Sequence, residues 1–320
     1  MWDFWFADDG EQFHMFYLHA PKTLGDPDLR HRNARIGHAT SADLVAWTDH
    51  GAVLEPGGPE DFDASATWTG CVIQGPDTIW RMYYTGSRFL SEDSATNVES
   101  IGVAKSADLH TWVKSAGPVV VADAQWYETL GSSDWPEEAW RDPWVFQDPD
   151  NARWHMIITA RAKSGSRDPR DRGVLGHATS LDLNRWEVQE PLSEPGAGFV
   201  HLEVPQVITM AGRSALLFSC DTPALAGHRA AEAQRGGIWI LEIDDLTGPF
   251  DPSKALLLAG DDLYSGRLIQ DRNKQWVLMA FENRDSSGSF VGVLSDPMPV
   301  NWEVGQPIMS FAADSIGPGL

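Results

Sequence analysis

Three carboxylates stand among aromatic or apolar residues, where an acid is unexpected. Asp3 lies in the run WDFWF, Asp142 in WRDPW and Glu203 in FVHLEVP. Burying a carboxylate among such neighbours costs free energy unless the group is hydrogen-bonded, paired or used in a reaction. Carboxyl groups with unequal pKa values can serve as a nucleophile and a general acid, so these three acids are candidate catalytic residues.

Each acid also has a purely structural interpretation. Asp3 is close to the chain end, where a turn or capping Asp is common. Asp142 follows Arg141, and the two can form a structural ion pair. Glu203 alternates with apolar neighbours, which favours a raised pKa, but a buried Glu with one structural partner would give the same pattern. Residue types alone leave these alternatives open.

An internal repeat indicates the structural elements that must position the acids. The clearest copies are GHATSADLVAW (37–47), GVAKSADLHTW (102–112) and GHATSLDLNRW (176–186); GVLSDPMPVNW (292–302) and GIWILEIDDLTGPF (237–250) are fainter. Each of the three clear copies predicts a short strand and then a Ser-x-Asp-Leu turn, in which the Ser and Asp side chains bond nearby amides. A Trp covers the turn. Periods of this length with several strands each are typical of propeller blades.

Five further strand-like segments alternate with the repeats. They are aromatic or β-branched and too short for packed helices: 13–18, 80–85, 154–160, 214–219 and 275–281. Five strands and five repeats predict an all-β chain in which residues 1–320 form one domain, a single five-bladed β-propeller. Residues 222–234 are expected to form a short helix or a polar loop, and 124–140 a loop near a functional face.

Composition excludes several partners. The net charge of −22 repels phosphate backbones, so no nucleic acid is expected. No apolar run reaches the roughly 18 residues of a membrane helix, and the N-terminal run lacks signal-peptide character, so we expect a cytoplasmic protein. Cys71 and Cys220 lack ligand spacing and the ten His residues form no HxxxH motif, so neither a metal nor a cofactor is expected. His38 and His177 occupy equivalent repeat positions, which indicates a structural role.

The order of the motifs resembles the glycoside hydrolases of family 32 and the related family 68. The matching runs are WDFWF, FHMFYL, SATWTG, WRDPWVF and HLEVPQV, and the resemblance covers about residues 2–305. It implies a five-bladed propeller acting on β-fructofuranosides. It also implies that Asp3 is the nucleophile, that Asp142 grips sugar hydroxyls in the transition state, and that Glu203 is the general acid/base.

The sugar-binding positions are less similar to the family. Leu18 stands where the family has a fructose-contacting Gln, Thr67-Trp68-Thr69-Gly70 replaces Phe-Ser-Gly-Ser, and Val204 replaces a Cys. We expect these 320 residues to lack the family's C-terminal β-sandwich. We expect a small carbohydrate to be bound by Trp2, Trp5, Trp68, Thr69, Arg141, His201 and Tyr264.

The three acids and the roles that the family resemblance implies for them predict a retaining mechanism. Asp3 would attack the anomeric carbon, while Glu203 would protonate the leaving oxygen and then activate water. Arg141 would orient the carboxylates. Three alternatives remain: an arabinofuranosidase like those of family 43, a fructosyltransferase, and a non-catalytic carbohydrate-binding propeller. The oligomeric state is not predicted.

Overall fold

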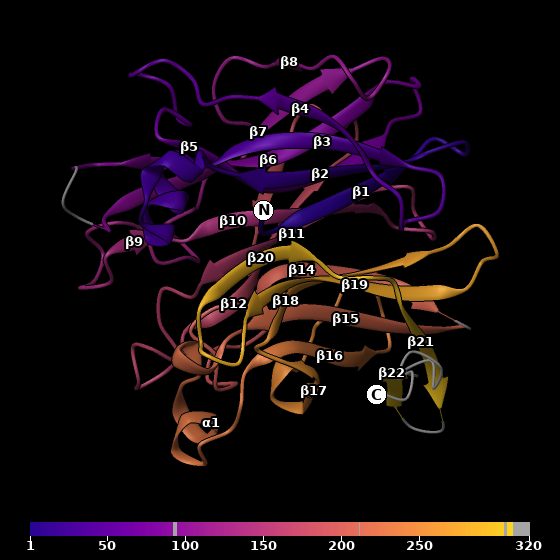
Figure 1. Cartoon of the computed structure of the whole chain (residues 1–320). Helices are drawn as coiled ribbons and strands as arrows, with labels where there is room; N and C mark the ends of the chain where they lie inside the picture. The colour runs from indigo at the N-terminus through magenta and orange to yellow at the C-terminus, as the bar shows by residue number, and fades with distance from the viewer. Residues whose placement is uncertain (92–94, 211, 304–305, 310–320) are drawn as a thin grey trace.

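Five antiparallel sheets follow one another along the chain and pack as the blades of a propeller (Figure 1). The computed structural model describes residues 1–91, 95–210, 212–303 and 306–309. Blade 1 contains β1 (Phe4–Asp8), β2 (Phe13–His19), β3 (Arg35–Ser41) and β4 (Thr48–Leu54). Blade 2 contains β5 (Ala66–Gln74), β6 (Trp80–Phe89), β7 (Asn97–Ser106) and β8 (Val113–Lys114), with β9 (Glu137–Glu138) parallel to β7.

The remaining blades repeat this order. Blade 3 contains β10 (Trp140–Gln147), β11 (Trp154–Arg161), β12 (Gly173–Ser180) and β13 (Glu187–Gln189). Blade 4 contains β14 (Glu203–Met210), β15 (Arg213–Cys220), β16 (Gly237–Ile243) and β17 (Leu256–Gly260). Blade 5 contains β18 (Leu263–Gln270), β19 (Trp276–Arg284), β21 (Met298–Glu303) and β22 (Gln306–Met309), and β20 (Phe290–Leu294) also pairs with β19.

This architecture confirms the predicted all-β, five-bladed propeller. The five predicted strands are β2, β6, β11, β15 and β19, which are the second strands of the five blades. The repeats begin in β3, β7, β12, β16 and β20. The innermost strands β1, β5, β10, β14 and β18 face the axis and contact one another from blade to blade. The assignment of residues 1–320 to one domain stays a prediction.

The Ser-x-Asp-Leu turn has the expected hydrogen bonds. Ser41 Oγ accepts from the amides of Asp43 and Leu44, at 3.1 and 2.9 Å, and Asp43 Oδ1 accepts from the next two amides. Leu44 adopts a φ of 66°, and the Trp47 indole donates to its carbonyl at 3.1 Å. The same Ser and Asp contacts recur in the copies at 106–112 and 180–186.

Helices are few and short. Beside the propeller strands are η1 (Lys22–Leu24), η2 (Pro27–Asn33), η3 (Thr222–Ala224), η4 (Pro252–Lys254) and the single turn α1 (Gly227–Ala231). The segment expected to be a short helix or loop therefore holds both η3 and α1. Within the described ranges, no helix has the length and apolar character needed to span a bilayer.

Candidate active site

The innermost strands of four blades carry a register irregularity at one end of the axis. It falls between Trp68 and Gly70 in β5, and between Arg141 and Trp144 in β10. The equivalent irregularities in β14 and β18 follow Glu203 and Tyr264. A bulge re-aims side chains and ends regular pairing, so consecutive residues can face the axis. Three bulge residues have positive φ: Asp142 (58°), Val204 (53°) and Ser265 (50°).

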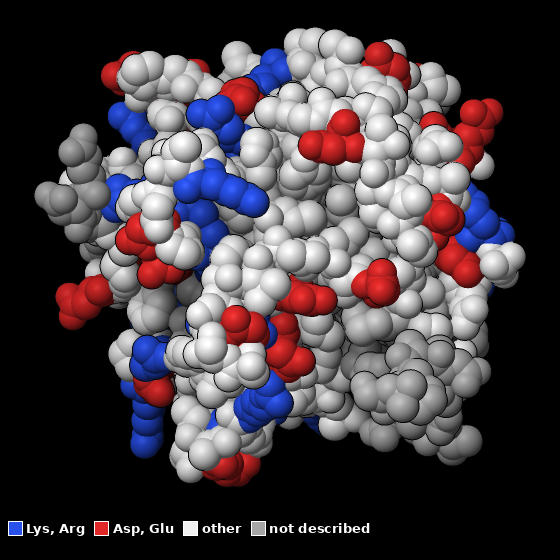
Figure 2. Space-filling view, in the orientation of Figure 1, with Lys and Arg blue, Asp and Glu red and all other residues white. Residues whose placement is uncertain are grey.

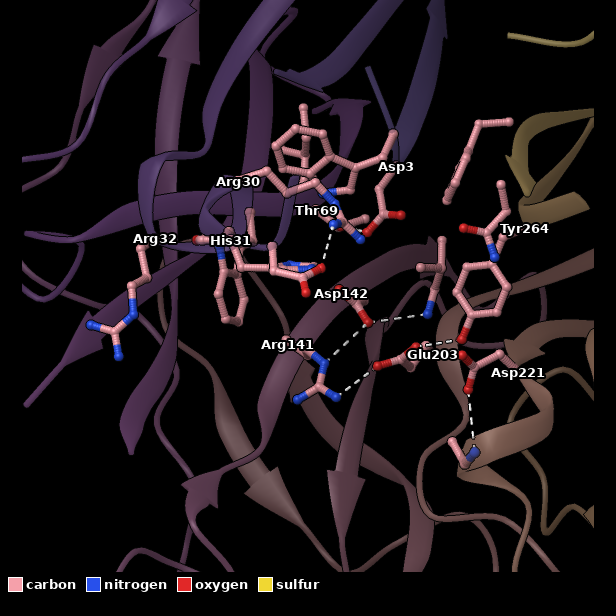
Figure 3. Close-up of a pocket in the computed structure, with 18 of the residues that line it drawn as sticks. Asp3, Arg30, His31, Arg32, Thr69, Arg141, Asp142, Glu203, Asp221 and Tyr264 are labelled. Atoms are coloured by element: carbon pink, nitrogen blue, oxygen red, sulfur yellow. Dashed lines mark hydrogen bonds and ion pairs between the residues drawn. The ribbon is translucent and has the colours of Figure 1, made fainter. Parts of the chain in front are cut away.

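A cavity of about 650 Å³ opens where these bulges meet (Figure 3). All three predicted acids line it: Asp3 from just before β1, Asp142 from β10 and Glu203 from the start of β14. The acids are far apart in sequence and come from three different blades. Figure 3 shows their carboxyl groups facing the same space.

Two hydroxyl groups hold the Asp3 carboxylate. Thr69 donates to Oδ2 at 2.5 Å, and Ser265 donates to Oδ1. Burial raises the pKa of Asp3 above its usual value; the two hydroxyl groups act against this rise, and the nearby Glu203 adds to it. Both oxygens are therefore fixed in place, with Asp3 presented to the cavity by blade 1 and held by blades 2 and 5.

Asp142 is the most deeply buried of the three acids, at 3% exposure. Its Oδ2 accepts from the Thr159 hydroxyl at 2.9 Å and from the Val204 amide at 3.1 Å, and Thr85 accepts from its backbone amide. Burial raises the pKa of Asp142 to about 7, although the Arg141 guanidinium acts in the opposite direction. Asp142 lies inside β10, at its bulge.

Glu203 lies between a cation and a phenol. Arg141 Nη2 donates to Oε1 at 2.7 Å, and the Tyr264 hydroxyl donates to Oε2 at 2.5 Å. Burial would raise the pKa of Glu203, but Arg141, His201 and Tyr264 outweigh it and bring the pKa below its usual value. The expectation of a raised pKa was therefore wrong. The apolar neighbours in the sequence gave no sign of the partners that other blades supply.

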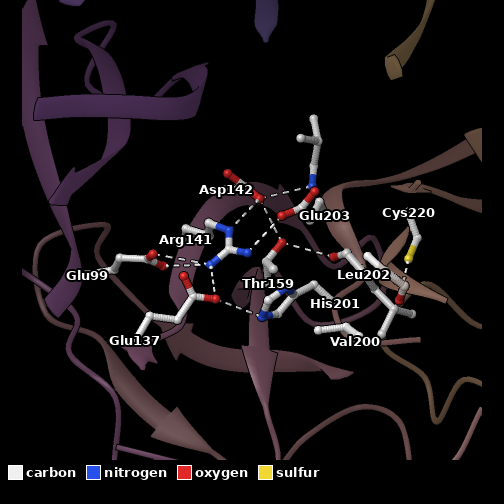
Figure 4. A network of polar contacts seen from close by, with 12 residues as sticks. Glu99, Glu137, Arg141, Asp142, Thr159, Val200, His201, Leu202, Glu203 and Cys220 are labelled. Atoms are coloured by element: carbon white, nitrogen blue, oxygen red, sulfur yellow. Dashed lines mark hydrogen bonds and ion pairs between the residues drawn. The ribbon is translucent and has the colours of Figure 1, made fainter. Parts of the chain in front are cut away.

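Arg141 is the centre of a buried polar network (Figure 4). Its Nη1 contacts both oxygens of Glu99 at 3.2 and 3.1 Å and one oxygen of Glu137 at 3.5 Å. His201 Nε2 lies 3.0 Å from the same oxygen of Glu137. Burial raises the pKa of Glu99; burial acts the same way on Glu137, but Arg141 and His201 bring the pKa of that group below its usual value.

The other predicted site residues fall into three groups. Trp2, Trp68, Thr69, Arg141 and Tyr264 line the cavity. His201 does not line it but supports Glu137, as just described. Trp5, predicted as a sugar-binding wall, is fully buried and stacks on Phe16 in the core, so it lies away from the cavity. Although Trp5 follows Asp3 by only two residues, its ring belongs to the buried core and not to the cavity wall.

Several site residues were missed by sequence reasoning. They are Glu99, Glu137 and Thr159 around Arg141 and Asp142, and Ser265 beside Asp3. A signal for the bulges was present: Gly or Pro follows the inward-facing residues in four blades, at Gly70, Pro143, Pro205 and Gly266. Gly and Pro within a strand often mark a bulge.

The altered family positions lie in the cavity wall. Leu18 and Val204 both line it, and the Trp68 indole donates to the carbonyl of His31 at 2.7 Å, so the ring is fixed against η2. The cavity rim also carries Arg30, Arg32 and Arg284. Figure 2 shows most of the visible Lys and Arg side chains on the side where η2 and β9 lie in Figure 1. This clustering contrasts with the net charge of −22 for the whole chain.

Known proteins resemble this chain in both sequence and fold. Raffinose invertase of Escherichia coli is 23% identical over 284 residues, 85% of this chain and 52% of that protein. Sucrose-6-phosphate hydrolase of Escherichia coli is 24% identical over 242 residues, 73% of this chain and 43% of that protein. The chain thus spans about half the length of these relatives.

Solved structures show the same fold. Inulosucrase from Halalkalicoccus jeotgali bound to kestose superposes with a TM-score of 0.80 at 24% identity, over 96% of this chain and 86% of that one. The catalytic domain of Microbacterium saccharophilum β-fructofuranosidase gives 0.76 at 17% identity, over 97% and 80%. The family model described as the glycosyl hydrolases family 32 N-terminal domain matches residues 6–293. The chain therefore belongs to glycosyl hydrolase family 32.

Proposed function

We propose that this chain is a retaining glycoside hydrolase that cleaves β-fructofuranosides through a covalent glycosyl-enzyme. The observation that carries the proposal is the meeting of Asp3, Asp142 and Glu203 in one cavity. Membership of family 32 supports the substrate class, and the names of the relatives, which include invertases and fructofuranosidases, agree with it.

In the first step, a carboxylate oxygen of Asp3 attacks the anomeric carbon as the bond to the leaving oxygen breaks. Glu203 gives its proton to that oxygen. Thr69 and Ser265 hold the Asp3 carboxylate in a fixed orientation toward the cavity, so the carboxylate loses little orientational freedom when it reacts. In the second step, Glu203 takes a proton from water, whose oxygen attacks the same carbon and releases Asp3.

Glu203 must carry a proton at the start of this cycle, although Arg141 favours its ionised form. The network around Arg141 supports this change of charge. When Glu203 is protonated, the guanidinium still has Glu99 and Glu137 as partners, so no buried cation is left unpaired. We assign Asp142 to the ring hydroxyls of the sugar, because its Oδ2 is held by Thr159 and Val204.

A fructosyltransferase is the second candidate, because a sugar hydroxyl can replace water in the second step. The similarity of the fold to that of an inulosucrase supports the fructosyltransferase candidate. The arabinofuranosidase and the non-catalytic binding protein are less consistent with the family assignment. The expected cytoplasmic location and the absence of nucleic-acid partners stay predictions.

The test is product release from sucrose, raffinose, kestose and sucrose 6-phosphate, with a chromogenic arabinofuranoside as the competing substrate. We expect fructose from at least one fructoside. We expect Asp3→Asn to abolish turnover and Glu203→Gln to lower kcat by about 10²–10⁴-fold. Asp28→Asn, at the cavity edge, is the matched control and should retain activity.

The results separate the candidates. Longer fructosides formed instead of free fructose would show a transferase, and release of arabinose alone would overturn the substrate class. Sugar binding without turnover would show a binding protein. Full activity in a correctly folded Asp3→Asn or Glu203→Gln protein would contradict the residue roles.

A further inference from the structure

Four histidines gather where blade 1 meets blade 2, away from the active-site cavity. His38 comes from β3, His50 from β4 and His110 from the turn after β7, and each offers a ligand atom within 4.8 Å of the others. Their ring centroids are 4.8–5.1 Å apart. His14, from β2, stands behind His38. None of the four lines the active-site cavity.

The polar contacts behind His38 determine which of its two ring nitrogens keeps a lone pair. Asp9 Oδ2 lies 3.2 Å from His14 Nε2, and His14 Nδ1 lies 2.9 Å from His38 Nε2. A carboxylate only accepts, so His14 Nε2 carries the hydrogen and His14 Nδ1 accepts from His38 Nε2. His38 Nδ1 is then left with its lone pair.

His38 is fully buried, and its Nδ1 has no hydrogen-bond partner. A buried nitrogen without a partner is costly, and a metal ion is one partner that satisfies it. Metal-bound histidines commonly donate their other ring N–H to an oriented acceptor, and the acceptor for His38 is His14, which Asp9 holds in turn.

Blade 3 provides an internal comparison. His155 and His177 lie in β11 and β12, the blade 3 equivalents of the strands that carry His14 and His38. His155 Nδ1 lies 3.0 Å from His177 Nε2, and the two rings are stacked in the same way. Asp148 takes the place of Asp9, at 3.9 Å from His155 Nε2. Among the described residues, no third imidazole groups with this pair. The pair alone is therefore a structural repeat, as the sequence predicted for His38 and His177. At blade 1 two further imidazoles join it, His50 from blade 1 and His110 from blade 2.

We propose that His38, His50 and His110 bind a transition-metal dication, with zinc as the best match. Three imidazoles and one water complete a tetrahedral zinc site. Zinc–nitrogen bonds of about 2.0–2.1 Å place ligand nitrogens roughly 3.4 Å apart in such a site. His50 and His110 are exposed, so side-chain rotation can close the remaining distance and the ion can enter from solvent.

The bound ion would join β3 and β4 of blade 1 to the turn that follows β7 of blade 2. This role is structural and independent of sugar cleavage. The earlier expectation that no metal is bound rested on the lack of a linear ligand motif, and these ligands are instead brought together by three separate segments.

The test uses the whole chain, freed of metal by chelator and dialysis. Zn²⁺ is titrated by calorimetry, and Co²⁺ is used as a spectroscopic probe of tetrahedral ligation. Excess Ca²⁺ is present because this hard cation occupies surface carboxylates and leaves imidazoles free. We expect one zinc per chain, a tetrahedral Co²⁺ spectrum and a rise in Tm on zinc addition.

Substitution of each of the two exposed ligands, with a matched control at another exposed histidine, tests the zinc site. His50→Ala and His110→Ala should each weaken zinc binding at least about 100-fold and remove the Tm rise, since even outer partners of a zinc site contribute 10–100-fold. His228→Ala, an exposed histidine on α1, should bind zinc as the wild type does. No zinc binding by the wild type, loss of binding in Ca²⁺, or unchanged binding by His110→Ala would overturn the proposal.

Discussion

At the scale of the residue, one guanidinium determines the charge state of the site. Arg141 contacts Glu99, Glu137 and Glu203 and lies 3.8 Å from Asp142. A single cation cannot compensate all these acids: the pKa values of Glu137 and Glu203 are lowered, whereas burial keeps those of Glu99 and Asp142 raised. Asp142, fully buried and not directly bonded to the guanidinium, is one whose pKa is raised.

This raised pKa predicts that ionisation of Asp142 lowers the free energy of unfolding at high pH, and that Asp142→Asn removes this loss. Burial raises the pKa to about 7, so between about pH 4 and pH 7 the unfolded chain has released the proton that the folded protein keeps. The free energy of unfolding therefore falls as pH rises through this window, by up to about 4 kcal/mol. Urea unfolding at pH 5 and pH 8 should show Asp142→Asn gaining stability over the wild type at pH 8. An equal difference at both pH values would contradict it.

Residue identity was accessible from sequence, but ionisation was not. Acids among aromatic and apolar neighbours marked Asp3, Asp142 and Glu203. The partners that set their pKa values come from other blades: Thr69 and Ser265 for Asp3, for example. Because no sequence period links such partners, the lowered pKa of Glu203 could not be foreseen.

At the scale of the element, the bulges in the innermost strands present the site. The bulges of β5, β10 and β14 each let two successive residues reach the cavity, and the bulge of β18 brings Tyr264 to the cavity and Ser265 to Asp3. Gly70 has a steric reason to be glycine: a Cβ there would lie 2.2 Å from the carbonyl oxygen of Tyr83. The neighbouring strand β6 would have to move, and Thr69 would move with β5.

Gly70→Ala is therefore expected to destabilise the fold and to impair the site together. Overpacking against backbone costs about 1–3 kcal/mol, and displacement of Thr69 from Asp3 should lower kcat. Thermal unfolding and turnover are measured side by side. Gly58→Ala, where a Cβ meets only Asp61 at 3.5 Å, is the control and should change neither. A fully stable and active Gly70→Ala protein would show that the bulge is not needed.

At the scale of the whole molecule, the propeller must close between blade 5 and blade 1. The amino terminus donates to the carbonyl of Gly292 at 2.9 Å, and Arg272 pairs with Asp8 at 2.8 Å. Near the axis, buried Arg267 of β18 donates to the carbonyls of Val204 and Pro205, at 3.1 and 2.9 Å. Its Nε also reaches the carbonyl of Phe4, in blade 1, at 3.4 Å.

Arg267→Met should therefore loosen the ring. The change leaves buried carbonyl groups of blades 1 and 4 without a donor, which costs about 2–5 kcal/mol in total. Arg213→Met removes an exposed pair with Glu242 and should cost no more than about 1 kcal/mol. Chemical denaturation of both variants gives the comparison. Equal stability of the two would contradict a role for Arg267 in closure.

The number of blades was predictable, but their closure was not. The Ser-x-Asp-Leu-x-x-Trp copies and the aromatic strands between them are local patterns, and the structure confirms both. Closure depends on contacts such as Arg267 with Phe4, between residues more than 260 positions apart. Trp5 was misplaced because its neighbours in sequence put it beside Asp3, whereas it packs in the core against Phe16 of β2.

The most direct test of the account is to trap the sugar on Asp3. Glu203→Gln is incubated with β-fructofuranosyl fluoride, whose fluoride leaves without a general acid while the variant lacks the base for hydrolysis. A carboxylate oxygen of Asp3 should form an ester with the anomeric carbon as the carbon–fluorine bond breaks. Peptide mass spectrometry should then find one fructosyl unit on Asp3; a sugar on another residue, or an unlabelled protein that still hydrolyses the fluoride, would contradict the account.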